Sequence, residues 1–351
     1  PMQDQTIKTN APVNEFAAAR QFFAGAGRKW WQVLAILTVA IGTFASLYHL
    51  YVPIVGAYDT FVLRPLHLLL ISLVGLLSFS IRGGKRDFSK PDWTWAIDFV
   101  LGVALTLSLV HILMDPTGLE ERFAYSEATT LDTVAAVALV ALVVELARRC
   151  IGLPIAILIV IILAYGIWGG DSFSIFRHRP IPTPEVFQGL YMTTFGIFGS
   201  PVAAMATYVF LFIIFGAYIE KCKTGMLIQR VGLKATGKSP GGPAKVAVVT
   251  SASFGTISGS ALANVMATGA VTIPLMKRIG FRKEDAGGIE AAASSGGQLT
   301  PPIMGAVAFV MSDITGIPYA DIIVAAAVPA LLFYVSLFVA IDLTARRDNM
   351  Q

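Results

Sequence analysis

Charged residues are scarce in this sequence. Asp, Glu, Lys and Arg account for 14% of its 351 residues, whereas soluble globular domains carry about 25%. Hydrophobic residues account for 55%. A soluble protein carries more charged residues on its surface than this composition supplies. The composition therefore indicates an integral membrane protein. The net charge of +4 does not indicate a nucleic acid partner, because the basic residues lie in short segments between long apolar runs.

Cysteine is scarce as well. Cys150 and Cys222 are its only occurrences, and they offer neither a disulfide framework nor the spacing of a metal site. We therefore expect two free thiols. A cleavable signal segment is not expected either, because about 30 mostly polar residues precede the first apolar run.

Catalytic motifs are lacking. HExxH and GxSxG do not occur, and the four histidines are scattered over positions 49, 67, 111 and 178. One segment, from Gly232 to Ser239, formally matches the phosphate-binding loop G-x4-G-K-S. It is followed by Pro240-Gly241-Gly242, where such a loop needs the start of a helix. We therefore predict neither an enzyme nor a bound cofactor.

Eight apolar stretches are candidates for membrane spans, since a hydrocarbon core of about 30 Å needs roughly 20 helical residues. The fourth and fifth are separated only by Ala147-Arg148-Arg149-Cys150, which predicts a tight turn. The candidate spans are Trp31–Tyr51, Phe61–Ile81, Trp93–Met114, Leu131–Leu146, Ile151–Trp168, Pro201–Tyr218, Ala286–Met311 and Ala320–Leu343.

The basic residues are distributed unevenly between these spans. With the N-terminus placed in the cytoplasm, 22 of the 26 Lys and Arg residues fall on the cytoplasmic side, and only Arg64, Arg122, Arg177 and Arg179 fall outside. Cytoplasmic loops of membrane proteins are enriched in Lys and Arg. The sequence therefore predicts that both termini are cytoplasmic.

A charge-free stretch of 31 residues, 246–276, lies between Lys245 and Lys277 and is rich in Gly, Ser, Thr and Asn. A single crossing would place Lys277 outside and invert every later span. A re-entrant hairpin leaves both Lys245 and Lys277 on the cytoplasmic side. Its two arms would have about 12–14 residues each, or roughly 18–21 Å of helix. Non-helical backbone at that depth survives only where it lines a cavity or is buried in protein. We therefore predict a helical hairpin at about 244–276.

The middle of this hairpin is polar but uncharged. Ser258, Gly259 and Ser260 form its tip, and Asn264 follows one helical turn later. Unwound carbonyls and side-chain oxygens can coordinate a cation, and helix N-termini can face an anionic substrate. A shell of neutral oxygens favours a monovalent cation over Ca²⁺, whose sites usually include carboxylates. The alternative is that Gly and Ser only permit close packing of membrane helices.

A second irregular stretch, residues 291–304, reads AAASSGGQLTPPIM. Its glycine pair and proline pair predict that the seventh span is broken within the membrane, because proline removes a backbone donor and disfavours helix before it. Broken helices that face each other form the binding sites of many transporters. Together with the hairpin tip, the predicted sodium or substrate site therefore includes Ser295, Gly296, Gly297, Gln298 and Thr300.

These segments resemble a known family. GGPAKVAVVTSASFGTISGSALANVMATGAVTIPLM (241–276), GIEAAASSGGQLTPPIMGAVAFVM (288–311) and FLFIIFGAYIEKCKTG (210–225) are similar to the large permease subunit of tripartite ATP-independent periplasmic (TRAP) transporters. The fused permease that works with TAXI-type binding proteins is the most similar type. The resemblance covers residues 129–351. Residues 1–128 resemble the small permease subunit by hydropathy and position alone, and the span 131–146 is left open between the two parts.

The resemblance implies one repeat of an inverted-repeat, elevator-type transporter in a bacterial inner membrane. Such a transporter is driven by sodium and imports an organic acid delivered by a periplasmic TAXI-type substrate-binding protein. Its sodium sites lie at the hairpin tip and the facing broken helix, which map here to the residues named above. The family's large subunit has two repeats, each with a hairpin, and this sequence shows one. We therefore expect the second half to come from the same reading frame or from a separate chain.

A proton-coupled carrier or a channel-like protein without binding-protein dependence is the alternative function, because ionisable groups inside a membrane are functional candidates. Asp98 and His111 lie in the third span, and Glu290 lies in the seventh. Each is close to an end of its span. We therefore expect all three to be solvated at the membrane interface.

Overall fold

The computed structural model describes residues 30–56, 59–88, 93–169, 178, 181–222 and 239–348, together with residues 227, 231 and 234. Among these residues there is no β-strand, and six helices are long and apolar enough to cross a membrane. This confirms the predicted all-α, multi-span membrane fold. The polar residues before Trp30 and most of the segment that resembles a phosphate-binding loop, 232–238, lie outside the described residues.

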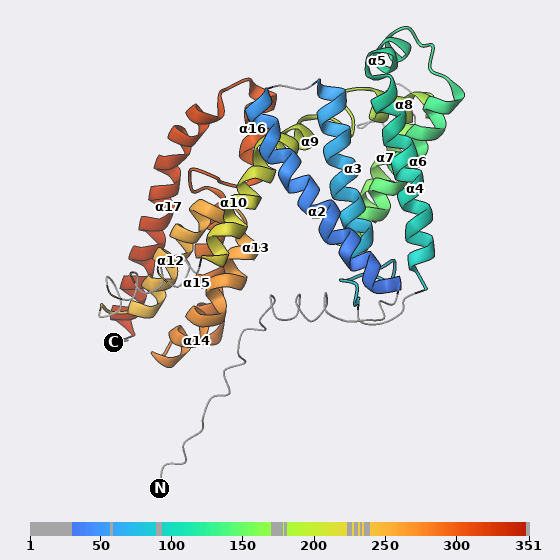
Figure 1. Cartoon of the computed structure of the whole chain (residues 1–351). Coiled ribbons are helices and arrows are strands. Elements are labelled where there is room, and N and C mark those ends of the chain that lie inside the picture. The colour runs from blue at the N-terminus through green and yellow to red at the C-terminus, as the bar shows by residue number, and fades with distance from the viewer. Residues whose placement is uncertain are drawn as a thin grey trace.

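The first part of the chain forms a bundle of helices (Figure 1). Its core is apolar and includes Leu76, Leu105, Leu139 and Tyr191, none of which exposes more than 1% of its surface. The helices are α2 (Trp30–Val55), α3 (Thr60–Ser78), α4 (Trp95–Met114), α5 (Pro116–Ala124), α6 (Thr130–Cys150), α7 (Leu153–Trp168) and α8 (Thr183–Met192).

Helix α6 is longer than the sequence predicts. Thr129 caps its start by accepting a hydrogen bond from the Asp132 amide at 3.2 Å, and the helix continues to Cys150 before the chain turns at Ile151–Gly152. The predicted turn at 147–150 is therefore wrong. The helix can continue because Arg149, which is 3% exposed, is paired with Asp98 instead of reaching into solvent.

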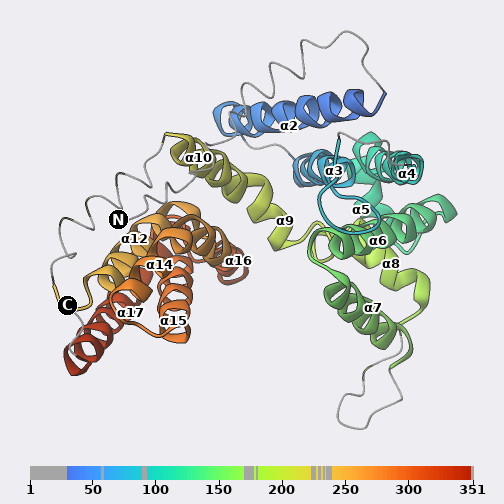
Figure 2. The same cartoon turned by 90° about the horizontal axis from the view of Figure 1, so that it is seen from below.

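A continuous helical rod joins the two parts of the chain. It consists of α9 (Ser200–Ala204), the π-helical turn η1 (Met205–Val209) and α10 (Phe210–Lys221), and it corresponds to the predicted span Pro201–Tyr218. Figure 2 shows this rod running between the two bundles. It packs on α3 in the first bundle and on α12 and α16 in the second.

The second part of the chain contains the predicted hairpin. Both of its ends lie at the C-terminal end of α17: a Cβ on Gly241 would lie 2.7 Å from Ala345 Cβ, and Phe281 belongs to the same apolar cluster as Ile341. A re-entrant hairpin requires this placement. The elements are α12 (Gly242–Ser258), α13 (Ala261–Asn264), η2 (Val265–Gly269), α14 (Ala270–Arg278), α15 (Lys283–Ser295), η3 (Gly296–Gln298), α16 (Ala306–Thr315) and α17 (Tyr319–Arg347).

The predicted break in the seventh span is present. Helix α15 ends at Ser295, the 3₁₀ turn η3 follows, and a non-helical turn continues to Gly305 before α16 begins. The remaining predicted spans correspond to α2, α3, α4, α6, α7 and α17, although α7 has only 16 residues.

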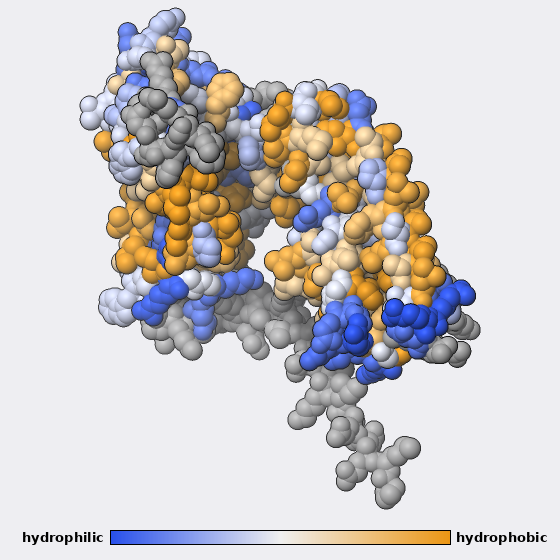
Figure 3. Space-filling model, turned by 180° about the vertical axis from the view of Figure 1, so that it is seen from behind, coloured by the Kyte–Doolittle hydropathy of each residue, from blue (hydrophilic) through white to orange (hydrophobic). Residues whose placement is uncertain are grey.

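The surface is apolar across its middle. Figure 3 shows hydrophobic residues over the middle of both bundles and hydrophilic residues at their lower ends, and also at the upper end of the first bundle. In the first bundle, Arg148 at the end of α6 donates a hydrogen bond of 2.6 Å to the Ile81 carbonyl, which places the α3–α4 loop beside it. Basic segments that are distant in sequence therefore meet at one end of the bundle. The side of the membrane that this end faces stays a prediction.

Candidate functional site

The hairpin and the broken helix meet through backbone. A Cβ on Gly255 in α12 would lie 2.4 Å from the Gly297 Cα in η3, so only glycines allow this approach. At the tip, a Cβ on Gly259 would lie 1.9 Å from the Met304 carbonyl oxygen in the turn before α16. The two interruptions that the sequence predicts are therefore in direct contact.

The hairpin tip is shaped by its own residues. Gly259 adopts φ +58°, a left-handed conformation that favours glycine, and its amide donates to the Gly255 carbonyl at 3.1 Å. The Ser260 side chain then caps α13 by accepting from the Ala263 amide at 3.3 Å. The Ser258 hydroxyl accepts a longer hydrogen bond, 3.4 Å, from the Ser260 amide. All three tip residues are half-buried.

Asn264 connects the two arms of the hairpin. Its side chain is fully buried, and its Nδ2 donates to the Ser251 carbonyl in α12 at 2.8 Å. The same Nδ2 would lie 3.3 Å from a Cβ on Gly297. The structure therefore brings Asn264 and Gly297 together, as the predicted site requires.

The other predicted residues of the break are arranged differently. Ser295 is exposed and donates to the Ala291 carbonyl of its own helix at 2.8 Å. Gln298 is exposed as well. Thr300 donates to the Gly296 carbonyl at 2.7 Å and contacts the Tyr334 hydroxyl of α17 at 3.3 Å. None of these hydrogen bonds joins Ser295, Gln298 or Thr300 to the hairpin, so the three side chains do not form one cluster with the tip.

Sequence reasoning missed a polar cluster beneath the tip. Glu290 in α15 exposes none of its surface, so the expectation that it is solvated at the membrane interface is wrong. Its Oε1 accepts from Thr268 at 2.5 Å and from Ser251 and Ser294 at 3.3 Å, and its Oε2 accepts from Thr272. We call these five residues the Glu290 cluster. The i, i+4 spacing of Thr268 with Thr272, and of Glu290 with Ser294, was the available signal.

Asp98 and His111 also differ from expectation, because neither is simply solvated. Asp98 is 4% exposed and forms ion pairs with both Arg86 and Arg149, the latter at 2.5 Å. His111 Nε2 lies 2.7 Å from Asp132 Oδ1 at the opposite end of the same bundle. These groups hold helices together and lie apart from the hairpin.

Two of the histidines that are scattered in the sequence meet in the fold. His49 in α2 and His67 in α3 are buried, and their facing nitrogens, Nε2 and Nδ1, are 2.7 Å apart. Both rings pack against Phe210 of the connecting rod. Among the described residues, no group of three or more His, Cys, Asp or Glu side chains could hold a metal ion.

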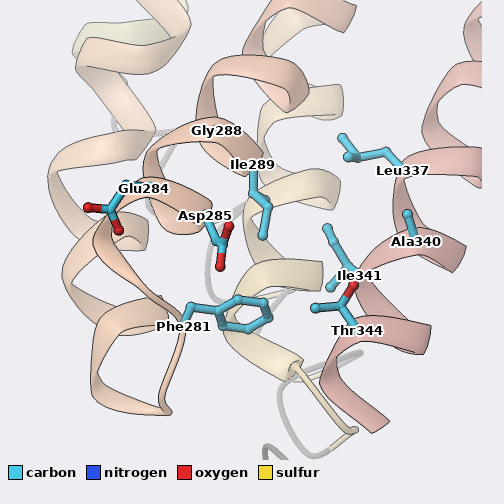
Figure 4. Close-up of a pocket in the computed structure, with 9 residues that line it drawn as sticks. All are labelled: Phe281, Glu284, Asp285, Gly288, Ile289, Leu337, Ala340, Ile341 and Thr344. Carbon is cyan, nitrogen blue, oxygen red and sulfur yellow. The ribbon is translucent and has the colours of Figure 1, made fainter. Parts of the chain in front are cut away.

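A pocket of about 300 Å³ lies near the base of the hairpin, between α15 and α17. Figure 4 shows Phe281 and Asp285 facing Ile341, whereas Glu284 points away from the other lining side chains. Arg282 donates to Asp285 at 2.7 Å and thereby lowers the pKa of that carboxyl. This pocket is charged and lies far along α15 from η3, so it is distinct from the hairpin tip.

The tip therefore offers neutral oxygens at a helix end. The last turn of α12 leaves carbonyls without helical partners, and the Met304 carbonyl faces Gly259 from the opposite side. Ser258, Ser260 and Asn264 add hydroxyl and amide oxygens, and no carboxylate lies within the hairpin. Such an arrangement can coordinate a monovalent cation.

The fold defines a membrane protein with a helical hairpin packed against a broken helix. The family model described as "Tripartite ATP-independent periplasmic transporter, DctM component" matches residues 138–351, which is more than half of the chain. The chain belongs to this family.

Two curated relatives are similar over part of the chain. The C4-dicarboxylate TRAP transporter large permease protein DctM of Vibrio cholerae is 32% identical over 139 residues, 40% of this chain and 30% of the relative. An uncharacterized protein, y4mL, of Sinorhizobium fredii is 31% identical over 137 residues, 39% of this chain and 32% of the relative. The matches thus span about a third of each relative's length. No solved structure matches this chain.

Proposed function

We propose that this chain is a permease component of a sodium-driven secondary transporter that imports an organic acid. The observation that carries the proposal is the contact of the hairpin tip with the broken helix, through Gly259 with Met304 and Asn264 with Gly297. Sodium binds among the neutral oxygens of Ser258, Ser260, Asn264 and the neighbouring carbonyls. Residues 295–300 supply backbone carbonyls, because the Ser295 side chain is turned to its own helix.

The substrate class follows from the family and from one relative. The V. cholerae relative is described as a C4-dicarboxylate permease, and small dicarboxylates are therefore the first substrates to test. A periplasmic TAXI-type substrate-binding protein delivers the acid, which is then carried across the membrane in an elevator-type cycle. The protein lies in the inner membrane with both termini in the cytoplasm.

The division of the chain is part of the same proposal. Residues 1–128 correspond to a small permease subunit, with three spans or with a fourth at 131–146, and residues 129–351 correspond to the first half of the large subunit. A second half with its own hairpin completes the site, because a site between inverted repeats needs both of them.

Reconstitution in liposomes tests the proposal. The complete permease, this chain with the second half, is assayed with its binding protein for uptake of labelled dicarboxylates under an imposed sodium gradient. We expect uptake that requires the sodium gradient and the binding protein, and no uptake by the 351-residue chain alone. Uptake that persists without the binding protein, or that follows a proton gradient with sodium absent, would favour the alternative carrier instead.

A further inference from the structure

Glu290 is a buried carboxyl with no basic partner. It exposes none of its surface, and the side chains that contact it by hydrogen bond are all hydroxyls. Among the described residues, no Lys, Arg or His forms an ion pair with it. A carboxylate buried without a counter-cation is strongly unfavourable. The group must therefore be neutralised by a cation or by a proton.

The charged groups nearby do not supply that cation. Lys245 on α12 is engaged by Asp342 at 2.5 Å and by Ser239 at 3.2 Å. The other ionisable residues on the elements packed around the cluster form neither a hydrogen bond nor an ion pair with Glu290: Lys277 and Arg278 on α14, Lys283, Glu284 and Asp285 on α15, and Asp321, Asp342, Arg346 and Arg347 on α17.

The two threonine hydroxyls that contact Glu290 each face more acceptors than they have hydrogens. Thr272 has one hydroxyl hydrogen but contacts two acceptors, the Thr268 carbonyl at 3.0 Å and Glu290 Oε2. Thr268 likewise has one hydrogen for the Asn264 carbonyl at 2.8 Å and Glu290 Oε1 at 2.5 Å. A proton on Oε2 of Glu290 resolves the Thr272 contacts, because it donates to the Thr272 hydroxyl while that hydroxyl donates to the Thr268 carbonyl.

Packing also favours a proton over a metal ion. The backbone of η2 lies directly against the carboxyl, since a Cβ on Gly269 would lie 3.1 Å from Glu290 Cγ. The Thr268 hydroxyl and Glu290 Oε1, at 2.5 Å, are at a hydrogen-bonding distance, which is too short for an ion to lie between the two oxygens. An apolar site can hold a carboxylic acid in its neutral form so that it donates a hydrogen bond.

We propose that Glu290 is a proton-carrying group of this protein, neutral while the hairpin is packed on α15 and ionised when the two separate. The step is a proton transfer from Oε2 to a water molecule that enters the opened contact, and its reversal on closing. No other bond changes. The ionised state rests on the proposed function, because it requires a transport cycle in which the hairpin separates from α15. The neutral state does not depend on the proposed function.

The neutral state is tested without transport. Infrared spectra of the purified full chain in lipid nanodiscs, at neutral pH and without sodium, are compared for the wild type and Glu290→Gln. We expect the wild type to show a protonated-carboxyl C=O band that shifts in D₂O and is lost in the variant. Glu284→Gln, an exposed carboxyl on the same helix, should keep the band. A difference confined to carboxylate bands, or a band abolished by adding sodium chloride, would overturn the proposal.

The ionising step is tested in the complete permease. Gln mimics the neutral acid, so Glu290→Gln should abolish the pH dependence of uptake. The control variant Glu284→Gln should retain it. Equal pH profiles for the wild type and Glu290→Gln would refute the proposed loss and regain of the Glu290 proton. If the Gln variant fails to fold, titration of the carboxyl band in wild type with ¹³C-labelled glutamate decides instead. Absence of any uptake by the wild type would count against the proposed function and leave the infrared result standing.

Discussion

Gly255 of the hairpin and Gly297 of the broken helix touch through their backbones: a Cβ on Gly255 would lie 2.4 Å from the Gly297 Cα, and a Cβ on Gly297 would lie 2.8 Å from the Gly255 Cα. The two residues are 42 positions apart in the sequence. This contact sets the distance between the hairpin and the 3₁₀ turn, and thereby the position of the tip. Small residues permit such close approach between membrane helices.

Gly255→Ala or Gly297→Ala should therefore push the hairpin away from η3. Overpacking in a close-packed interior costs about 1–3 kcal/mol, and we expect a loss of that size in the free energy of unfolding, measured by denaturant titration in detergent. Gly287→Ala and Gly288→Ala on α15 are matched controls, because a Cβ at either position meets nothing within 4 Å. Equal effects in all four variants would contradict the interpretation.

Gly259 carries two constraints that can be separated. Its φ of +58° disfavours any side chain, and its Cβ would also lie 1.9 Å from the Met304 carbonyl oxygen. Gly316 has a similar φ of +70° but open space around it. Gly316→Ala should thus cost only the backbone strain, about 1–2 kcal/mol, whereas Gly259→Ala should cost more and Gly259→Val more again. Thermal unfolding of the three variants in nanodiscs compares them, and similar shifts would show that the tip does not press on Met304.

The buried ion pairs of Asp98 should matter more than surface pairs. Asp98→Asn removes the carboxylate that Arg86 and Arg149 share, whose side chains are 3% and 0% exposed, although Arg149 keeps its ion pair with Glu145 at 2.6 Å. Removing one partner of such a buried pair costs roughly 3–5 kcal/mol. Asp285→Asn, which removes an exposed partner of Arg282, should change the free energy of unfolding by about 0.5 kcal/mol or less. The two variants are compared by the same denaturant titration.

The sequence predicted the helices, the hairpin and the break because these depend on local composition: a charge-free run, a glycine pair, a proline pair. It did not predict the surroundings of Asp98 and Glu290. The first pairs with Arg149, 51 residues later, and the second accepts from Ser251, 39 residues earlier. Whether such a carboxyl is solvated depends on tertiary packing, which no periodicity encodes. For the same reason Ser295 was placed in the site although its side chain faces its own helix.

Topology is testable by cysteine labelling in a background that lacks Cys150 and Cys222. Single cysteines at Lys85, Glu127 and Lys277 replace residues that the structure shows as exposed. The charge distribution predicts that cysteines at 85 and 277 react with a membrane-impermeant reagent only from the cytoplasmic side, and the cysteine at 127 only from outside. Labelling of 85 and 277 from opposite sides would refute the re-entrant hairpin.

The last prediction concerns sodium. In the complete permease, Ser258→Ala and Ser260→Ala each remove one neutral oxygen from the tip, while the backbone carbonyls there remain. Losing one such group costs on the order of 1–3 kcal/mol, which corresponds to roughly 5- to 150-fold in affinity. We expect the half-saturation of uptake for sodium to rise accordingly. Asn264→Ala should raise the half-saturation more than either serine variant, because its buried side-chain amide also donates to the Ser251 carbonyl of the opposite arm at 2.8 Å.

Ser312→Ala on α16 is the control, since that hydroxyl donates to the Ile317 carbonyl at 2.7 Å, outside the hairpin and the break. Its half-saturation for sodium should equal that of the wild type. If Ser258→Ala, Ser260→Ala and Asn264→Ala all kept the wild-type value too, the tip would be a packing element only. Sodium would then bind elsewhere in the permease, because removing oxygens that coordinate the ion must weaken its binding.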